Sequence, residues 1–193
     1  MDLQILDMAG ARPEHSVVIV NFVSAIRKQL KNSTCFVFPD NVQYKMKLKD
    51  GSEKVIIPDA SINCMTKARK GNTFLEIPRF VMEVLSPSTE KYDRGEKMEL
   101  YRKQEIDEYW IVDWEKRKVE IYNLDYDENG IPQYYLFKIV TKENKEEILL
   151  FIQRLKEIDS SSVNTFNSDF FYLGDFYVRN FTFKNKKRKK DKR

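Results

Sequence analysis

The sequence predicts an α/β domain in which helices flank a central mixed β-sheet. A helical pattern comes first, several strand patterns follow, and a second helix and further strands come after them, which is the order expected of such a fold. The run Phe80–Leu85 is almost entirely apolar, as in a strand that is buried on both faces. With 193 residues, of which 41% are hydrophobic, the chain is long and apolar enough to bury a core.

The first third of the chain predicts one helix and then strands. Pro13 and Glu14 suit the first turn of a helix, and apolar residues follow at helical spacing, so we expect a helix over about residues 13–31. The polar stretch Thr66–Thr73 predicts a loop. β-branched and aromatic residues predict strands at Cys35–Phe38, Val42–Leu48 and Val55–Ile62, with turns at Pro39-Asp40 and Asp50-Gly51.

The middle of the chain predicts a strand, a helix and two further pairs of strands. Ser86-Pro87-Ser88-Thr89 ends the strand Phe80–Leu85 and supplies capping residues for a helix over about residues 92–104. The strands expected next are Tyr109–Asp113 and Val119–Leu124, joined as a hairpin, and then a pair at Tyr134–Val140 and Ile148–Ile152.

By composition, the chain divides into a domain, a docked segment and a tail. We expect residues 1–158 to form the domain and the aromatic end of residues 159–183 to dock on it. Residues 184–193 hold eight Lys and Arg and one Asp, and this basic tail is expected to be disordered. The tail either attracts nucleic-acid phosphates or is simply solvated. Without it the net charge is −3, against +4 for the whole chain.

Because cysteine and histidine are scarce, few kinds of metal site and catalytic mechanism are open to this chain. Two cysteines exclude a cysteine-rich zinc site and a disulfide scaffold, and His15 is the single histidine. The six glycines form no phosphate-binding or dinucleotide-binding loop. No apolar run approaches the roughly 20 residues of a membrane span, and the N-terminus lacks a signal-peptide pattern, so we expect a cytoplasmic protein without a membrane partner. An enzyme of this composition is expected to use carboxylates and lysine.

Three sets of charged residues are candidates for a site, and each also has an ordinary structural explanation. Glu83 interrupts the apolar run, where burying its carboxylate costs several kcal/mol unless a cation pairs with it. On an edge strand the same residue would simply face solvent. Asp59 follows Pro58 at a bend, as an ordinary turn aspartate does. Asp93 and Lys97 lie four residues apart on one helix face, which by itself describes a surface ion pair.

Taken together, these residues resemble the PD-(D/E)xK nuclease superfamily. Pro58-Asp59 and the later strand with Glu83 match its two carboxylates, but Leu85 stands where the motif has a lysine. A longer run resembles a bacterial family of "putative restriction endonucleases", long carried as a domain of unknown function. The residues that carry this likeness are Phe80–Thr89, Asp93, Lys97, Tyr101, Glu108–Asp113 and the pair Glu14-His15, whereas Gln104-Glu105 departs from the family pattern.

The resemblance, which covers about residues 55–123, implies a restriction-endonuclease-like fold and Mg²⁺-dependent endonucleolytic cleavage of DNA, with Mn²⁺ as an alternative ion. It implies that Asp59, Glu83 and the backbone carbonyl of Val84 hold the metal. It further implies that a lysine has moved from the strand to the following helix, where Lys97 assists the attacking water. A homodimer is expected because the two strands of DNA need two sites.

Other residues are expected to support these ligands. Asp93 would orient Lys97 and keep it protonated, and Tyr101 would share that role. Glu14 would approach the metal from the first helix, as the acid of the N-terminal helix does in the superfamily. His15 is expected to cap or pack rather than to bind.

Two alternatives to a nuclease remain open at this point. The mildly acidic body is compatible with a catalytically inactive nuclease fold that acts as a binding or regulatory module. A small structural domain in which Asp93, Lys97 and Glu83 form an internal ion-pair network is the other alternative. Binding of a divalent metal by Asp59 and Glu83 separates the enzyme from both.

Overall fold

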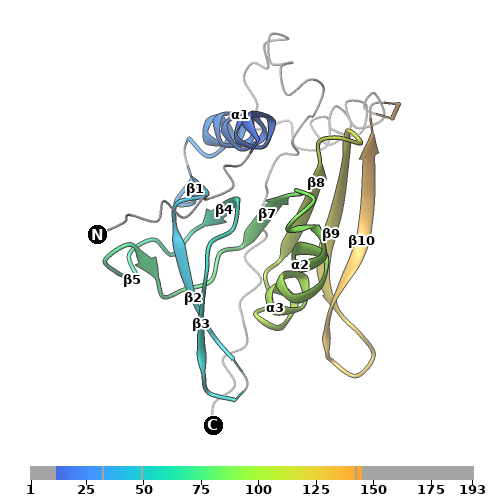
Figure 1. Ribbon diagram of the computed structural model, residues 1–193. Helices are drawn as coiled ribbons and strands as arrows, with labels where there is room; N and C mark the ends of the chain where they lie inside the picture. The colour runs from blue at the N-terminus through green and yellow to red at the C-terminus, as the bar shows by residue number, and fades with distance from the viewer. Residues whose placement is uncertain (1–11, 32, 49, 142, 145–193) are drawn as a thin grey trace, which may run out of the picture.

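The part of the chain that the structure describes is built from two β-sheets and two helical segments (Figure 1). The computed structural model describes residues 12–31, 33–48, 50–141 and 143–144. The helices are α1 (Pro13–Gln29), α2 (Glu90–Tyr92), the π-helical turn η1 (Asp93–Lys97) and α3 (Met98–Lys103). The strands are β1 (Phe36–Pro39), β2 (Gln43–Lys47), β3 (Glu53–Ile56), β4 (Ala60–Asn63), β5 (Arg69–Lys70), β6 (Thr73–Phe74), β7 (Phe80–Val84), β8 (Glu108–Asp113), β9 (Lys118–Tyr126) and β10 (Pro132–Thr141).

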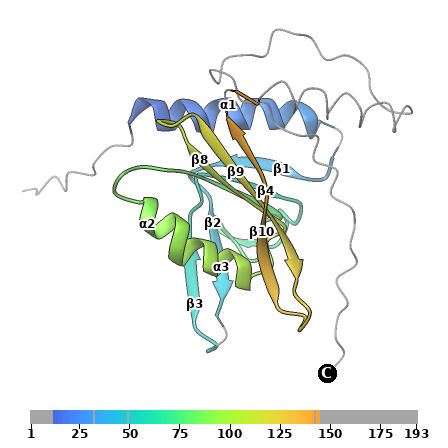
Figure 2. The same ribbon diagram turned by 90° about the vertical axis from the view of Figure 1, so that its right-hand side faces the viewer.

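The large sheet has the strand order β1-β4-β7-β8-β9-β10. Strands β7 and β8 pair in parallel, whereas the other neighbours pair antiparallel, so the sheet is mixed. Helix α1 covers one face, and the segment α2-η1-α3 covers the other (Figure 2). The predicted α/β architecture with a central mixed sheet flanked by helices is therefore confirmed.

Strand β7 is buried along its whole length, as its apolar sequence predicts. Its alternate side chains enter two different cores. Phe80 and Met82 pack in the cluster that contains α1, while Val81 packs in the cluster that contains α3. Because side chains alternate along a strand, Glu83 points to the same face as Val81, toward the helix that follows the strand.

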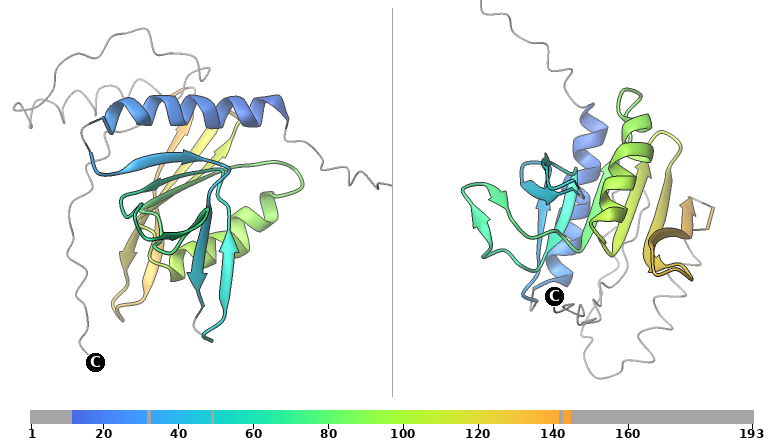
Figure 3. Two further views of the ribbon diagram at one scale, coloured as in Figure 1. Left: turned by 90° about the vertical axis from the view of Figure 1, so that its left-hand side faces the viewer. Right: turned by 90° about the horizontal axis from the view of Figure 1, so that it is seen from below.

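The small sheet has the order β3-β2-β6-β5, and its hairpin of β2 and β3 projects away from α1 (Figure 3). The sequence predicts one strand over Val55–Ile62, whereas the structure divides this stretch at Pro58-Asp59 between β3 of the small sheet and β4 of the large one. Proline removes a ladder hydrogen bond, which favours a break at this position. The expected loop Thr66–Thr73 contains β5 and the first residue of β6.

The last described strand and the two cysteines complete the pairing of the large sheet. Strand β10 pairs antiparallel with β9, and the expected partner at 148–152 lies outside the described residues, as do the segments 159–183 and 184–193. Cys35 and Cys64, which flank the paired strands β1 and β4, form a disulfide. Within the described ranges there is no helix long and apolar enough to cross a membrane.

Candidate active site

The site begins where the pairing of β4 with β7 ends. Ala60 is opposite Met82 in the last pair of this ladder, so the next residue, Asp59, lies opposite Glu83. The backbone N–H of Asp59 donates a hydrogen bond to Glu83 Oε2 at 3.3 Å, and the backbone N–H of Val84 donates to Asp59 Oδ2 at 2.7 Å. Side chains therefore replace the backbone ladder here, which brings two carboxylates from distant parts of the sequence together.

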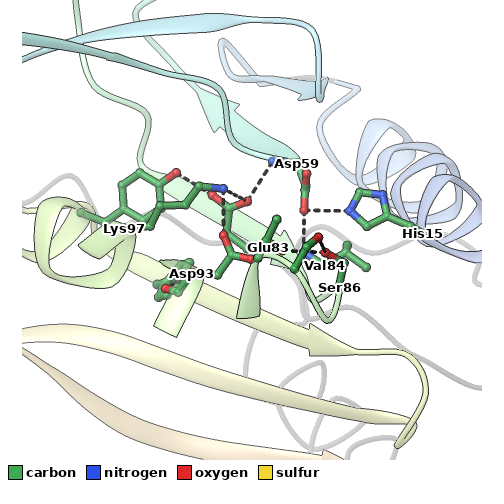
Figure 4. A network of polar contacts seen from close by, with 11 residues as sticks. His15, Asp59, Glu83, Val84, Ser86, Asp93 and Lys97 are labelled. Atoms are coloured by element: carbon green, nitrogen blue, oxygen red, sulfur yellow. Dashed lines mark hydrogen bonds and ion pairs between the residues drawn. The ribbon is translucent and has the colours of Figure 1, made fainter. Parts of the chain in front are cut away.

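Lys97 joins this pair from the helix. Its Nζ lies 2.8 Å from Glu83 Oε2 and 2.9 Å from Asp93 Oδ1 (Figure 4). All three side chains are almost inaccessible: Glu83 is 0% exposed, Asp93 2% and Lys97 13%. The lysine that the strand lacks at Leu85 is thus supplied by the next helix, at the position that the sequence suggested.

The π-helical turn η1 places Asp93 and Lys97 side by side. It is a single wide turn between α2 and α3, and its hydrogen bonds join residues five apart rather than four. In a wider turn, residues four apart lie more nearly in line along the axis than they do in an α-helix. Turns of this kind are frequent at functional sites. The sequence predicts a helix over this region but not the π turn within it.

Two buried tyrosines complete the network. The hydroxyl of Tyr101 donates to Glu83 Oε1 at 2.6 Å, and the hydroxyl of Tyr109 donates to the backbone carbonyl of Asp93 at 2.9 Å. Each oxygen of the Glu83 carboxylate therefore receives at least one hydrogen bond from the protein. Tyr101 therefore contacts Glu83 directly and is linked to Lys97 only through the Glu83 carboxylate.

Burial dominates the electrostatics of the network. It raises the pKa of Glu83 to about 8, while the adjacent Lys97 ammonium acts in the opposite direction. Burial alone would lower the pKa of Lys97, but Glu83 and Asp93 outweigh it and the pKa is raised. Lys97 therefore keeps its charge, and it is a fixed cation between two carboxyl groups in a region of low dielectric.

A second contact, which the sequence interpretation missed, reaches Asp59 from α1. His15 Nε2 lies 3.1 Å from Asp59 Oδ2, and the side chains are 13% and 20% exposed. The hydrogen bond with Asp59 raises the pKa of His15, against the effect of burial. Glu14, which was expected to approach the metal, is exposed, and the contact is made by the next residue. Pro13 correctly indicates where the helix begins, but it does not indicate which side chain of the first turn faces the sheet.

The donor atoms of the site suit a hard divalent cation. Asp59 and Glu83 offer carboxylate oxygens and Val84 a backbone carbonyl, which are the ligand types that Mg²⁺ prefers. Asp59 is the partly exposed carboxylate of the two, whereas Glu83 already accepts hydrogen bonds from Lys97 and Tyr101. A cation that takes Glu83 as a ligand must therefore replace one of these donors. In the described part of the chain, no three His, Cys, Asp or Glu side chains are grouped closely enough to hold a metal by themselves.

A comparison with known protein families assigns the chain to one of them. The family model Uma2, described as "Putative restriction endonuclease", matches residues 2–153. The chain belongs to the Uma2 family. This match confirms the resemblance that the motifs between Asp59 and Asp113 predicted, and extends it over most of the domain.

Two similar proteins are consistent with this assignment. An uncharacterized protein of Synechocystis sp. (strain ATCC 27184 / PCC 6803 / Kazusa), slr1290, is 32% identical to this Uma2 chain over 123 residues. The match covers 63% of each protein, so the chain spans less than two thirds of this relative's length. A solved structure from Anabaena variabilis, described as "a putative nuclease belonging to DUF820", is 19% identical, with a TM-score of 0.50. The match covers 65% of the Uma2 chain and 68% of that structure, and it shows that the two share a fold.

Proposed function

We propose that this Uma2 protein is a metal-dependent endonuclease that hydrolyses phosphodiester bonds in DNA by a PD-(D/E)xK-type mechanism. The observation that carries the proposal is the contact of 2.8 Å between Lys97 Nζ and Glu83 Oε2, made beside Asp59. Two carboxylates and a lysine are the residues this mechanism needs, and here they come from three separate elements. The family description supports the same reaction.

Each residue has a role that follows from its position. Asp59, Glu83 and the Val84 carbonyl would hold Mg²⁺ or Mn²⁺. When bound, such an ion polarises the phosphate and lowers the pKa of a coordinated water. Lys97 is a charged donor that stabilises negative charge as it develops on the phosphate, and it orients the attacking water. Asp93 holds Lys97 in place at 2.9 Å and favours its protonated form.

We propose a homodimer as the active form, because cleavage of both strands of a duplex requires two sites. The duplex carries a negative charge on every phosphate, so the acidic body of the chain is expected to bind it weakly. Cations held in the site, namely Lys97 and the metal, would therefore provide much of the local attraction. Binding and cleavage are expected to weaken as the salt concentration rises.

The same contacts support a second candidate function. Lys97 lies between Glu83 and Asp93, as expected of an internal ion-pair network that stabilises a catalytically inactive binding or regulatory module. This candidate predicts a folded protein that binds no divalent metal at Asp59. Metal binding therefore separates the two functions more directly than the geometry does.

Cleavage of plasmid DNA by the purified full chain tests the proposal. We expect nicked and linear products with Mg²⁺ or Mn²⁺ and none with EDTA. Glu83→Gln keeps the size of the side chain and removes its charge, so it should abolish cleavage while the circular dichroism spectrum stays unchanged. Lys103→Ala is the matched control, because Lys103 pairs with Glu99 on the surface of the same helical segment and should be dispensable. Undiminished metal-dependent cleavage by Glu83→Gln would overturn the proposed site.

A further inference from the structure

The side chain of His15 is held by the site rather than by its own helix. Its Nε2 lies 3.1 Å from Asp59 Oδ2, and the same oxygen accepts a hydrogen bond from the backbone N–H of Val84 at 2.7 Å (Figure 4). Its Nδ1 is buried and has no hydrogen-bond partner among the residues that the structure describes. Because Nε2 contacts Asp59 and Nδ1 has no partner in the described ranges, His15 does not cap helix α1, whose N-cap residue is Arg12.

The distance between the two side chains matches that of two ligands on one ion. Neighbouring ligands in an octahedral shell, each about 2.1 Å from the cation, are about 3 Å apart. His15 Nε2 and Asp59 Oδ2 are 3.1 Å apart, so an ion could contact both without a change in their separation. The backbone of Val84 lies beside them, because its N–H donates a hydrogen bond to the same Asp59 oxygen at 2.7 Å.

An imidazole nitrogen changes which ion such a group of ligands prefers. Carboxylate and carbonyl oxygens suit Mg²⁺ and also Mn²⁺, whereas imidazole suits iron, nickel, copper and zinc, and the affinity of such ligands rises from Mn²⁺ through Co²⁺ to Ni²⁺. We infer that His15 is a direct metal ligand beside Asp59 and that it makes the site prefer transition-metal ions to Mg²⁺, with Mn²⁺ as the weakest-binding of them. This inference rests on the proposed function, because it assumes that Asp59 binds the metal, and it adds a ligand from α1.

The composition of the chain allows a direct test. His15 is the single histidine among the 193 residues, so histidine labelled with the heavier nitrogen isotope marks this ring alone when the protein carries no histidine tag. The full chain is loaded with Mn²⁺, and pulsed electron paramagnetic resonance is recorded for labelled and unlabelled protein. We expect the signal of a nitrogen bound to the ion, and we expect that signal to change with the isotope.

The outcomes distinguish this inference from the proposed function. If Mn²⁺ binds, is lost in Asp59→Asn and shows no histidine nitrogen, His15 is not a ligand, and the inference fails while the metal site stands. If Mn²⁺ does not bind, or binds equally well to Asp59→Asn, the proposed metal site fails and the inference fails with it. Because the isotope comparison uses the wild-type chain, misfolding of a variant cannot obscure whether His15 is a ligand, and the circular dichroism spectrum of Asp59→Asn checks that this variant is folded.

Affinity measurements give an independent second test. His15→Gln should weaken Mn²⁺ binding on the order of tenfold or more, since even outer-shell changes at metal sites have effects of this size. Its Mg²⁺ affinity should change far less, so the ratio of the two affinities falls. Ser16→Ala, at the exposed neighbouring position of α1, is the matched control and should leave both affinities unchanged. An equal loss for both ions would overturn the proposed selectivity.

Discussion

Lys97 Nζ lies 2.8 Å from Glu83 Oε2, and the two residues come from a helical turn and from the middle strand of the sheet. Position 85 of that strand is a leucine, which packs in the core beneath the helix. The ammonium group beside the Glu83 carboxylate comes from the following helix instead.

Removing Lys97 should destabilise the metal-free protein and make it more responsive to metal. Lys97→Ala leaves two buried carboxyl groups without their cation, at a cost of about 3 kcal/mol or more. It also frees Glu83 Oε2 for a cation, so added Mn²⁺ should raise the Tm of this variant more than that of the wild type. Differential scanning calorimetry with and without Mn²⁺ measures both effects. Equal Tm shifts in the two proteins would contradict the competition between Lys97 and metal.

The Tyr101 hydroxyl should matter for both stability and cleavage. Tyr101→Phe removes a buried hydrogen bond of 2.6 Å to Glu83, and we expect a loss of about 1–3 kcal/mol because a fully buried acceptor oxygen loses its donor. Tyr134→Phe is the control, since its hydroxyl donates to the neutral carbonyl of Ile106, and it should cost about 1 kcal/mol. Urea unfolding gives the stabilities. Cleavage should fall for Tyr101→Phe and not for Tyr134→Phe.

Glu120 should contribute to unfolding at low pH. Burial raises its pKa, but hydrogen bonds from Arg94, Lys118 and Tyr122 outweigh this, and its pKa is lowered to about 2. A carboxyl with a lowered pKa stabilises the fold above the pKa of the unfolded chain, and this contribution is lost as the pH falls through the folded value. Stability should therefore decline between about pH 4.5 and pH 2.

Glu120→Gln should flatten this decline, as measured by urea unfolding across that pH range. Glu128→Gln, at an exposed acid between β9 and β10, is the control and should leave the slope unchanged. If the stability of Glu120→Gln declines with falling pH as steeply as that of the wild type, groups other than Glu120 cause the decline.

The disulfide should stabilise the fold without affecting the site. Cys35 and Cys64 are 29 residues apart, and closing a loop of this length lowers the entropy of the unfolded chain by an amount worth about 3.6 kcal/mol. Adding a reductant should lower the free energy of unfolding of the wild type by this amount. The free energy of unfolding of the double variant Cys35→Ser, Cys64→Ser should not change with reductant. Metal affinity should be the same in the oxidised and reduced proteins.

Local patterns predicted the parts of the fold that depend on local sequence. The helix beginning at Pro13, the buried strand at Phe80 and the helix containing Asp93 and Lys97 follow from periodicity, apolar runs and breakers. The break at Pro58 between two sheets was missed, because sheet membership depends on pairing with distant strands. The contact of His15 was missed for a related reason, since the direction in which a helix crosses a sheet is set by packing of the whole face.

The chain crosses from the small sheet to the large one at Pro58, and Asp59 is the next residue. Strand β3 ends at Ile56, so only Ile57 and Pro58 separate the projecting hairpin from Asp59. The placement of the Asp59 carboxylate therefore depends on how the two sheets are joined, whereas Glu83 lies within β7, a strand paired with β4 and with β8.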